Sequence, residues 1–286
     1  MSLRDCCDID SGELEAVAGE LARLGAARVL EHRGGPLGVE AKTGRNDPVT
    51  VADRASEEAI VARLGTLRPD DGVLAEEGGR RRSASALRWV IDPLDGTVNC
   101  IYGRPDVAVS VACERLAGGA WSPVAGAVVD VGRGDLYSAA AGLGARRNGE
   151  RISVSEVADL SMALVATGFS YSAASRSRQA AALALVVPVA RDVRSSGSAA
   201  LELCWVAAGL SDAYYEDELA EWDTAAGRLI VAEAGGCVTG LGHGGVVASG
   251  RGVHGELCAV LRPGGDRSAG AQALEGRARG RREGPL

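Results

Sequence analysis

Apolar residues recur at helical spacing near the start of the chain. Across residues 11–32 they fall every three or four positions, which predicts a helix with Ser11 or Asp10 as its N-cap. A second helix is expected from about residue 52 to residue 67, with a short strand or hairpin arm at residues 39–44 between the two. The chain is therefore expected to begin with a helical layer.

The pattern changes to strands after the second helix. Runs rich in valine and alanine predict strands at residues 72–75, 89–91, 107–111 and 124–131. A further strand and a hairpin are expected across residues 135–149, with Asn148-Gly149 as the turn. Residues 80–85 are polar and predict a loop. A largely antiparallel sheet should follow the helical layer.

From about residue 157 the pattern alternates between strand and helix, which predicts a smaller α/β half. Strands are expected at residues 164–167, 192–194 and 212–216, and helices at residues 176–189, 199–208 and 222–234. We expect residues 10–263 to form one unit with halves at about 10–155 and 156–263. Residues 264–286 are rich in Gly and Arg and predict a flexible tail.

Composition narrows the classes of function. The 286 residues are 46% hydrophobic and 24% charged, as in soluble globular proteins, and the net charge of −7 argues against nucleic-acid binding. No signal peptide is visible, and no apolar run approaches the ~20 residues of a membrane helix. The seven cysteines are scattered, so we expect free thiols in a reducing cytoplasm. The three histidines are too dispersed to suggest a histidine-based triad.

The stretch Trp89-Val90-Ile91-Asp92-Pro93-Leu94-Asp95-Gly96-Thr97 carries the candidate chemistry. Pro93 lacks an N–H, so the strand is expected to stop at Asp92. Asp92 and Asp95 should then lie on a tight bend, where Gly96 lets the backbone approach a ligand. Two carboxylates this close repel each other unless a cation or proton lies between them. An ordinary surface turn is the alternative.

Similar carboxylates recur where predicted strands end and helices begin. They are Asp53, Glu76 with its neighbour Glu77, Asp92, Asp95, Glu216 and Asp223. A site made of carboxylates alone suits Mg²⁺, and two such ions about 4 Å apart can activate water and bind a phosphate. Gly197-Ser198, at a predicted helix start, is either a phosphate seat or a serine N-cap. The residues favour magnesium-dependent phosphoryl transfer.

Two stretches resemble the signatures of the inositol monophosphatase family. Residues 89–99 resemble the first signature, and Trp222-Asp223-Thr224-Ala225-Ala226-Gly227 with residues 233–236 resembles the second. Further matches lie at residues 47–53, 76–77 and 194–200, so the likeness covers about residues 10–262. It implies an α/β fold of five layers, an αβαβα sandwich, usually paired as a homodimer. It also implies Mg²⁺-dependent, lithium-sensitive hydrolysis of a small phosphorylated metabolite.

The resemblance also assigns residues to two or three Mg²⁺ ions. Glu76, Asp92 and the Leu94 carbonyl would bind the first ion. Asp92, Asp95 and Asp223 would bind the second, and a third would rest on Glu76 and, through water, on Asp53. Thr97, paired with Asp53 and assisted by Glu76, would orient and deprotonate the attacking water.

Substrate contacts follow from the same resemblance. The amides of Gly96 and Thr97 would hold the phosphate. The sugar or cyclitol would be contacted at Asp95, Gly197, Ala199, Glu216 and Asp223. Three further positions are candidates: Lys42, the only lysine, stands at the spacing of a lysine near the metals in some relatives, Glu77 follows Glu76, and Glu221 adds an acid near the pocket mouth.

Departures from the family pattern leave the substrate open. Cys100 replaces an aromatic residue, and residues 168–171 lack a serine pattern that touches substrate in some animal relatives. Glu216 suits a cyclitol hydroxyl, so inositol monophosphate is favoured. Adenosine 3′,5′-bisphosphate, histidinol phosphate and fructose 1,6-bisphosphate are the alternative substrates. A non-catalytic protein that binds a phosphorylated metabolite is the alternative of another class.

Overall fold

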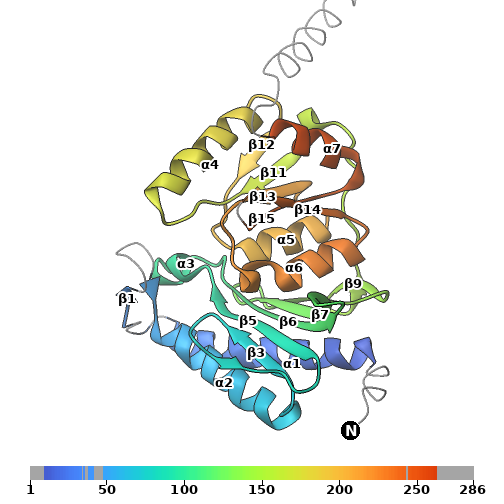
Figure 1. The fold of residues 1–286 in the computed structure, drawn as a ribbon. Coiled ribbons are helices and arrows are strands. Elements are labelled where there is room, and N and C mark those ends of the chain that lie inside the picture. The colour runs from blue at the N-terminus through green and yellow to red at the C-terminus, as the bar shows by residue number, and fades with distance from the viewer. Residues whose placement is uncertain (1–9, 34, 36–37, 42–47, 243, 263–286) are drawn as a thin grey trace, which may run out of the picture.

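The computed structural model describes residues 10–33, 35, 38–41, 48–242 and 244–262. Helices and sheets alternate in five stacked layers (Figure 1). Two helices, an eight-stranded sheet, two more helices, a five-stranded sheet and two final helices follow one another. The αβαβα sandwich expected from the resemblance is therefore confirmed.

The first layer contains the two predicted helices. α1 spans Ser11–His32, and the Asp10 side chain caps it by accepting a bond from the Gly12 amide. α2 spans Val51–Leu67 and begins with a capping box between Thr50 and Asp53. The short strands β1 (Glu40–Ala41) and β2 (Pro48–Val49) pair just before it.

The eight-stranded sheet has the order β10-β9-β8-β7-β6-β5-β3-β4. Its strands are β3 (Gly72–Ala75), β4 (Arg80–Arg81), β5 (Leu87–Asp95), β6 (Ala108–Ala117), β7 (Ala120–Asp130), β8 (Asp135–Ala140), β9 (Gly144–Arg147) and β10 (Glu150–Arg151). All neighbours are antiparallel except β3 and β5. Successive side chains of β5 point to opposite faces of the sheet. Trp89 and Ile91 pack on α1 and α2, and Val90 packs on the two helices that lie between the sheets.

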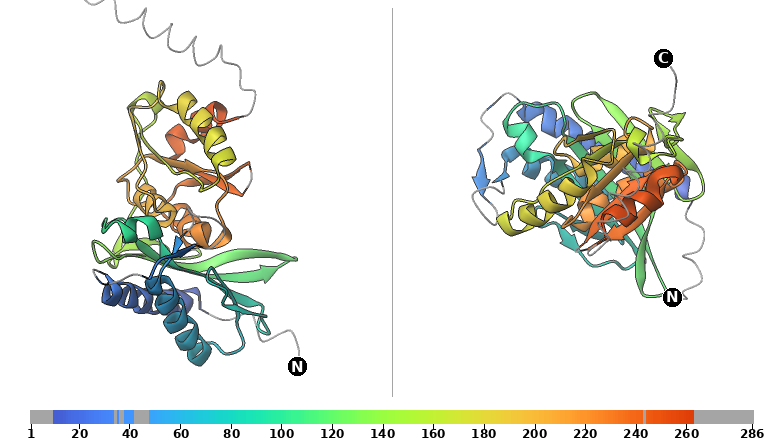
Figure 2. Two further views of the ribbon diagram at one scale, coloured as in Figure 1. Left: turned by 90° about the vertical axis from the view of Figure 1, so that its left-hand side faces the viewer. Right: turned by 90° about the horizontal axis from the view of Figure 1, so that it is seen from above.

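The second half builds the five-stranded sheet in the order β12-β11-β13-β15-β14. Its strands are β11 (Leu164–Thr167), β12 (Asp192–Arg194), β13 (Ala213–Glu216), β14 (Cys237–Leu241) and β15 (Gly245–Ser249). α5 (Ala199–Ala207) and α6 (Glu221–Glu233) lie between the sheets, and α4 (Ala173–Val186) and α7 (Arg251–Val260) cover the far face (Figure 2). A single 3₁₀ turn, Leu160–Met162, precedes β11.

Three expectations from the sequence were wrong or incomplete. β5 does not stop at Asp92 but continues to Asp95, and its register against β6 shifts between those residues because Pro93 has no N–H to donate. Arg80 and Arg81 form the edge strand β4 rather than loop. The pattern after residue 236 was not interpreted, although β14, β15 and α7 lie there.

The described helices and cysteines bear on two further features of the chain. Among the helices that the structure describes, none is both long and apolar enough to span a bilayer. Five cysteines are free thiols, of which Cys100, Cys113 and Cys204 are buried. Burial raises the pKa of Cys113 to about 12, so this thiol stays protonated. Cys6 and Cys7 lie outside the described residues.

Candidate active site

Strand pairing brings two of the predicted acids together. β3 and β5 run parallel, with Ala75 opposite Ile91, so Glu76 and Asp92 follow at the same edge of the sheet. The Glu76 amide donates to the Ile91 carbonyl at 3.2 Å. The parallel register therefore makes neighbours of two acids that lie far apart in sequence.

Burial and neighbouring charge both act on Asp92. Its side chain is buried, and burial raises its pKa well above the ordinary value. The carboxylates of Glu76, Asp95 and Asp223 raise that pKa further, in that order. Four carboxylates from β3, β5 and the start of α6 thus lie close enough to repel one another.

The bulge at Pro93 sets the geometry between Asp92 and Asp95. The Leu94 amide donates to Asp92 Oδ1 at 3.0 Å, and Ser56 Oγ donates to the Pro93 carbonyl at 2.8 Å. The Leu94 carbonyl lies 3.2 Å from Thr97 Oγ1. The bulge therefore holds both aspartates and the Leu94 carbonyl beside the start of the next helix.

The structure joins Thr97 to Asp53. Thr97 Oγ1 donates to Asp53 Oδ1 at 3.0 Å, although the two residues come from different elements. The other oxygen, Asp53 Oδ2, accepts the Thr50 amide at 2.9 Å and Thr50 Oγ1 at 2.5 Å. Asp53 is fully buried, so these bonds fix both of its oxygens. The Asp53 carboxylate therefore both caps α2 and orients the Thr97 hydroxyl.

Gly96 makes the turn between β5 and the short helix α3 (Thr97–Ile101). Its φ is +88°, in the left-handed region. A Cβ at this position would lie 2.7 Å from the Asp106 carbonyl, so only glycine fits. The turn brings the Thr97 hydroxyl back to the Leu94 carbonyl of β5.

The second half closes the site through α5. Gly197 has a φ of +87°, and Ser198 caps α5 by accepting the Leu201 amide at 3.3 Å. The interpretation of Ser198 as an N-cap is therefore confirmed. Ser198 Oγ and the Ala200 amide donate to Asp95 Oδ2 at 2.6 and 2.8 Å, so the start of α5 binds a carboxylate of the other half. Ala199 is buried next to these groups.

Glu216 and Asp223 are the remaining acids of the site. Glu216 ends β13, accepts the Tyr214 hydroxyl at 2.7 Å, and has its pKa raised by burial to about 7. Gly168 lies so close to it that a Cβ there would collide with the Glu216 carboxylate. Asp223 Oδ2 accepts the Ala220 amide at 2.7 Å, while burial and then Asp95 raise the Asp223 pKa well above its usual value.

The three additional candidates have different positions. The Glu77 amide donates to Glu57 Oε2 at 2.7 Å, which shapes the turn after Glu76. Glu221 is 57% exposed and forms an ion pair with Arg88 at 2.5 Å. Lys42 lies outside the described residues.

The residues that hold the loop around Ser196, just before α5, were not predicted from the sequence. Asn99 Nδ2 lies 2.8 Å from both the Asp106 and the Ser196 carbonyls, joining the two halves. Glu202 Oε1 accepts the Ser196 amide at 2.8 Å from the other side. The position of Asn99 two residues after Thr97 was the available signal, but its partner loop lies almost a hundred residues away.

The donor set fits a hard divalent cation. Within the described ranges, no three His, Cys, Asp or Glu side chains already surround one point at coordination geometry. The acids that converge on Asp92 supply oxygen donors only, and their mutual repulsion raises its pKa. A divalent cation removes such repulsion and prefers oxygen ligands, so Glu76, Asp92, Asp95 and Asp223 suit Mg²⁺ better than zinc.

Comparison with known proteins decides the family. The model of the inositol monophosphatase family matches residues 10–267. The chain belongs to the inositol monophosphatase family. An inositol-1-monophosphatase of Mycobacterium leprae is 48% identical, over 89% of this chain and 95% of that protein.

Solved structures of family members agree in fold. The structure of Mycobacterium tuberculosis SuhB is 46% identical and superposes with a TM-score of 0.77, covering 89% of this chain and 97% of that one. The extragenic suppressor protein suhB of Bartonella henselae gives a TM-score of 0.82 at 33% identity, covering 88% and 99%. Membership in this family makes the chain a phosphomonoesterase, and the family is generally metal-dependent.

Proposed function

We propose that this chain hydrolyses inositol monophosphate to inositol and inorganic phosphate, with Mg²⁺ as cofactor. The observation that carries the proposal is the convergence of three carboxylates on Asp92 beside the Thr97–Asp53 hydrogen bond. Both halves contribute to this site, so we treat residues 10–263 as one catalytic unit. The M. leprae relative, which is named an inositol-1-monophosphatase, supports the choice of substrate.

The metal ligands follow from the donor atoms. Glu76, Asp92 and the Leu94 carbonyl would hold one Mg²⁺, and Asp92, Asp95 and Asp223 a second. A third, weaker ion would rest on Glu76 and Asp53. Bound Mg²⁺ supplies Lewis acidity and lowers the pKa of water in such a site. Asp95 has a restricted orientation, because Ser198 and Ala200 bind one of its two oxygens.

Each protein group at the site has a separate role in the proposed hydrolysis. Thr97 and Glu76 orient the attacking water. The proton that this water loses passes to the Thr97 hydroxyl as that hydroxyl gives its own proton to Asp53. The amides of Gly96 and Thr97 face the phosphate oxygens. The attack breaks the bond between phosphorus and the ester oxygen, and the inositol oxygen leaves with a proton from solvent.

The second half selects the alcohol. Carboxylates accept hydrogen bonds from hydroxyl groups, and the site has one at Glu216, where β13 ends, and one at Asp223, in the first turn of α6. The Gly197 turn and Ala199 offer backbone and a small side chain, which leave room for a cyclitol ring. These residues favour a polyhydroxylated ring over a purine.

A phosphate-release panel tests the proposal. Purified protein with Mg²⁺ would be assayed on inositol 1-phosphate, adenosine 3′,5′-bisphosphate, histidinol phosphate and fructose 1,6-bisphosphate. We expect the highest kcat/KM with inositol 1-phosphate. A higher value with another substrate would refute the substrate, and binding without phosphate release from any of them would refute hydrolysis.

Three further properties belong to the same proposal. Li⁺ should inhibit turnover, because it displaces a Mg²⁺ in enzymes that the chain resembles. We also propose a homodimer, which sedimentation velocity would reveal at about twice the 29.2 kDa chain mass. The free buried thiols support a cytoplasmic location.

A further inference from the structure

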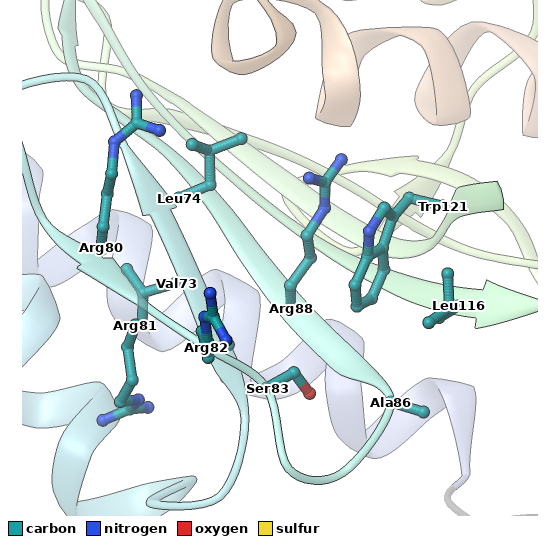
Figure 3. Close-up of a pocket in the computed structure, with 11 residues that line it drawn as sticks. Val73, Leu74, Arg80, Arg81, Arg82, Ser83, Ala86, Arg88, Leu116 and Trp121 are labelled. Carbon is teal, nitrogen blue, oxygen red and sulfur yellow. The ribbon is translucent and has the colours of Figure 1, made fainter. Parts of the chain in front are cut away.

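A second pocket lies on the eight-stranded sheet, away from the acidic site. Its volume is about 680 Å³, within the range of small-molecule sites. Strands β3, β4 and β5 and the hairpin of β6 and β7 supply its walls (Figure 3). None of the acids assigned to catalysis lines it.

Positive charge concentrates in this pocket. Arg80, Arg81, Arg82 and Arg88 line it, and the guanidinium groups of Arg80 and Arg88 extend to the same side of the sheet (Figure 3). Arg81 extends to the opposite side, where it donates to the Asp71 and Arg68 carbonyls at 2.7 and 2.9 Å. Three guanidinium groups therefore gather in one cavity of a chain whose net charge is −7.

Only one of these three arginines is neutralised by the described residues. Arg88 pairs with Glu114 at 2.6 Å and with Glu221 at 2.5 Å. Arg80 and Arg82 are exposed, and neither forms an ion pair with any residue the structure describes. Gathered guanidinium groups repel one another, and a bound anion relieves that repulsion.

An apolar wall stands beside the charge. The Arg88 guanidinium lies 4.7 Å from the centre of the Trp121 ring. Leu116, which is 41% exposed, and Leu74 continue the surface on either side of that pair. A guanidinium stacked on an indole gives a flat surface that carries positive charge, which suits a planar ring joined to an anionic group.

We propose that this pocket binds an organic anion in which a phosphate is joined to a planar ring, of the nucleoside monophosphate class. The phosphate binds Arg80 and Arg82, and the ring packs on Trp121 and Leu116. Arg88 contacts both parts of the ligand. The site is separate from the catalytic one and does not depend on the proposed reaction.

The pocket has a direct connection to the acidic site. Glu221 is the first residue of α6, two positions before Asp223, and its partner Arg88 lies four positions before Asp92 on β5. An anion in the pocket competes with Glu221 for the Arg88 guanidinium. Glu221→Gln removes that competitor and should therefore tighten binding at least threefold.

Calorimetric titration with adenosine monophosphate tests the proposal. The titration uses the whole chain in EDTA at low salt, so that hydrolysis cannot occur. The double variant Arg80→Ala/Arg82→Ala should bind at least tenfold more weakly. Arg23→Ala/Arg191→Ala, which removes two exposed arginines elsewhere, is the matched control and should stay within twofold of the wild type.

Additional probes separate the two parts of the ligand and the two sites. Adenosine monophosphate should bind more tightly than inorganic phosphate or adenosine alone, and Trp121→Ala should remove that advantage. Asp92→Asn should leave the affinity unchanged. Four results would each overturn the proposal. The wild type could show no saturable binding of adenosine monophosphate, or it could bind inorganic phosphate equally tightly. The control variant could lose as much affinity as Arg80→Ala/Arg82→Ala, or Asp92→Asn could lose affinity.

Discussion

Replacing Thr97 with valine tests the water-orienting pair with little change in shape. The substitution exchanges the hydroxyl for a methyl group, and so removes the 3.0 Å bond to Asp53 Oδ1. Asp53 Oδ2 keeps its two bonds from Thr50, at 2.9 and 2.5 Å, whereas the buried Oδ1 loses the bond from Thr97. We expect the free energy of unfolding to fall by about 1.5–3 kcal/mol, the value of one hydrogen bond to a charged group.

The effect on catalysis should be much larger than the effect on stability. A positioned acid–base group contributes about 10²- to 10⁴-fold to the rate, so kcat of Thr97→Val should fall by about that factor. KM should change little, because the hydroxyl acts on water rather than on the alcohol. Phosphate release from inositol 1-phosphate measures kcat and KM, and urea unfolding measures the free energy.

Thr97→Ser supplies the matched control. Serine keeps the hydroxyl and loses only a methyl group, so its kcat should remain within about tenfold of the wild type. The reasoning is refuted if Thr97→Val keeps more than a tenth of the wild-type kcat. It is equally refuted if the serine variant loses as much activity as the valine variant while both remain folded.

Three other predictions concern charge and backbone. Asp92→Asn should abolish turnover yet raise the melting temperature of metal-free protein, since it removes a buried charge that faces other carboxylates; a lower melting temperature would contradict the repulsion. Because the Glu216 pKa is raised from 4.5 to about 7, its contribution to stability is complete below pH 4.5 and is lost as pH rises through 7. Melting curves in EDTA at pH 5 and pH 8 should therefore differ less in Glu216→Gln. Gly96→Ala should destabilise the fold by about 1–3 kcal/mol and lower kcat, because alanine is strained at a φ of +88° and would crowd the Asp106 carbonyl; denaturant titration and the phosphate-release assay measure both, and wild-type values would contradict the close approach.

Most elements could be predicted because their signals are local. Helix α1 follows directly from its spacing of apolar residues and from Asp10, whose side chain caps it. The Asn148-Gly149 turn works because both residues have positive φ, at 53° and 86°. The same logic is wrong at Pro93, whose missing N–H predicts that the strand ends at Asp92. The strand instead tolerates the missing donor through a shift in register against β6.

The candidate site was only partly accessible from the sequence. Its acids could be recognised from strand ends, helix starts and family signatures. Their supporting contacts could not, because Ser198 and Asn99 act on partners about a hundred residues away. Such pairs depend on how the two sheets stack over α5 and α6, which no local pattern reports.

The sequence by itself determined the local chemistry of this protein: which segments form helices and strands, which carboxylates are available, and that Gly96 can turn the chain. Only the tertiary structure decided what those groups meet. It places Glu76 beside Asp92 through the parallel pairing of β3 and β5, and it directs Glu221 to Arg88. The physical reason is that side-chain type and backbone preference act within a few residues, whereas electrostatic repulsion and hydrogen bonding depend on distances set by packing.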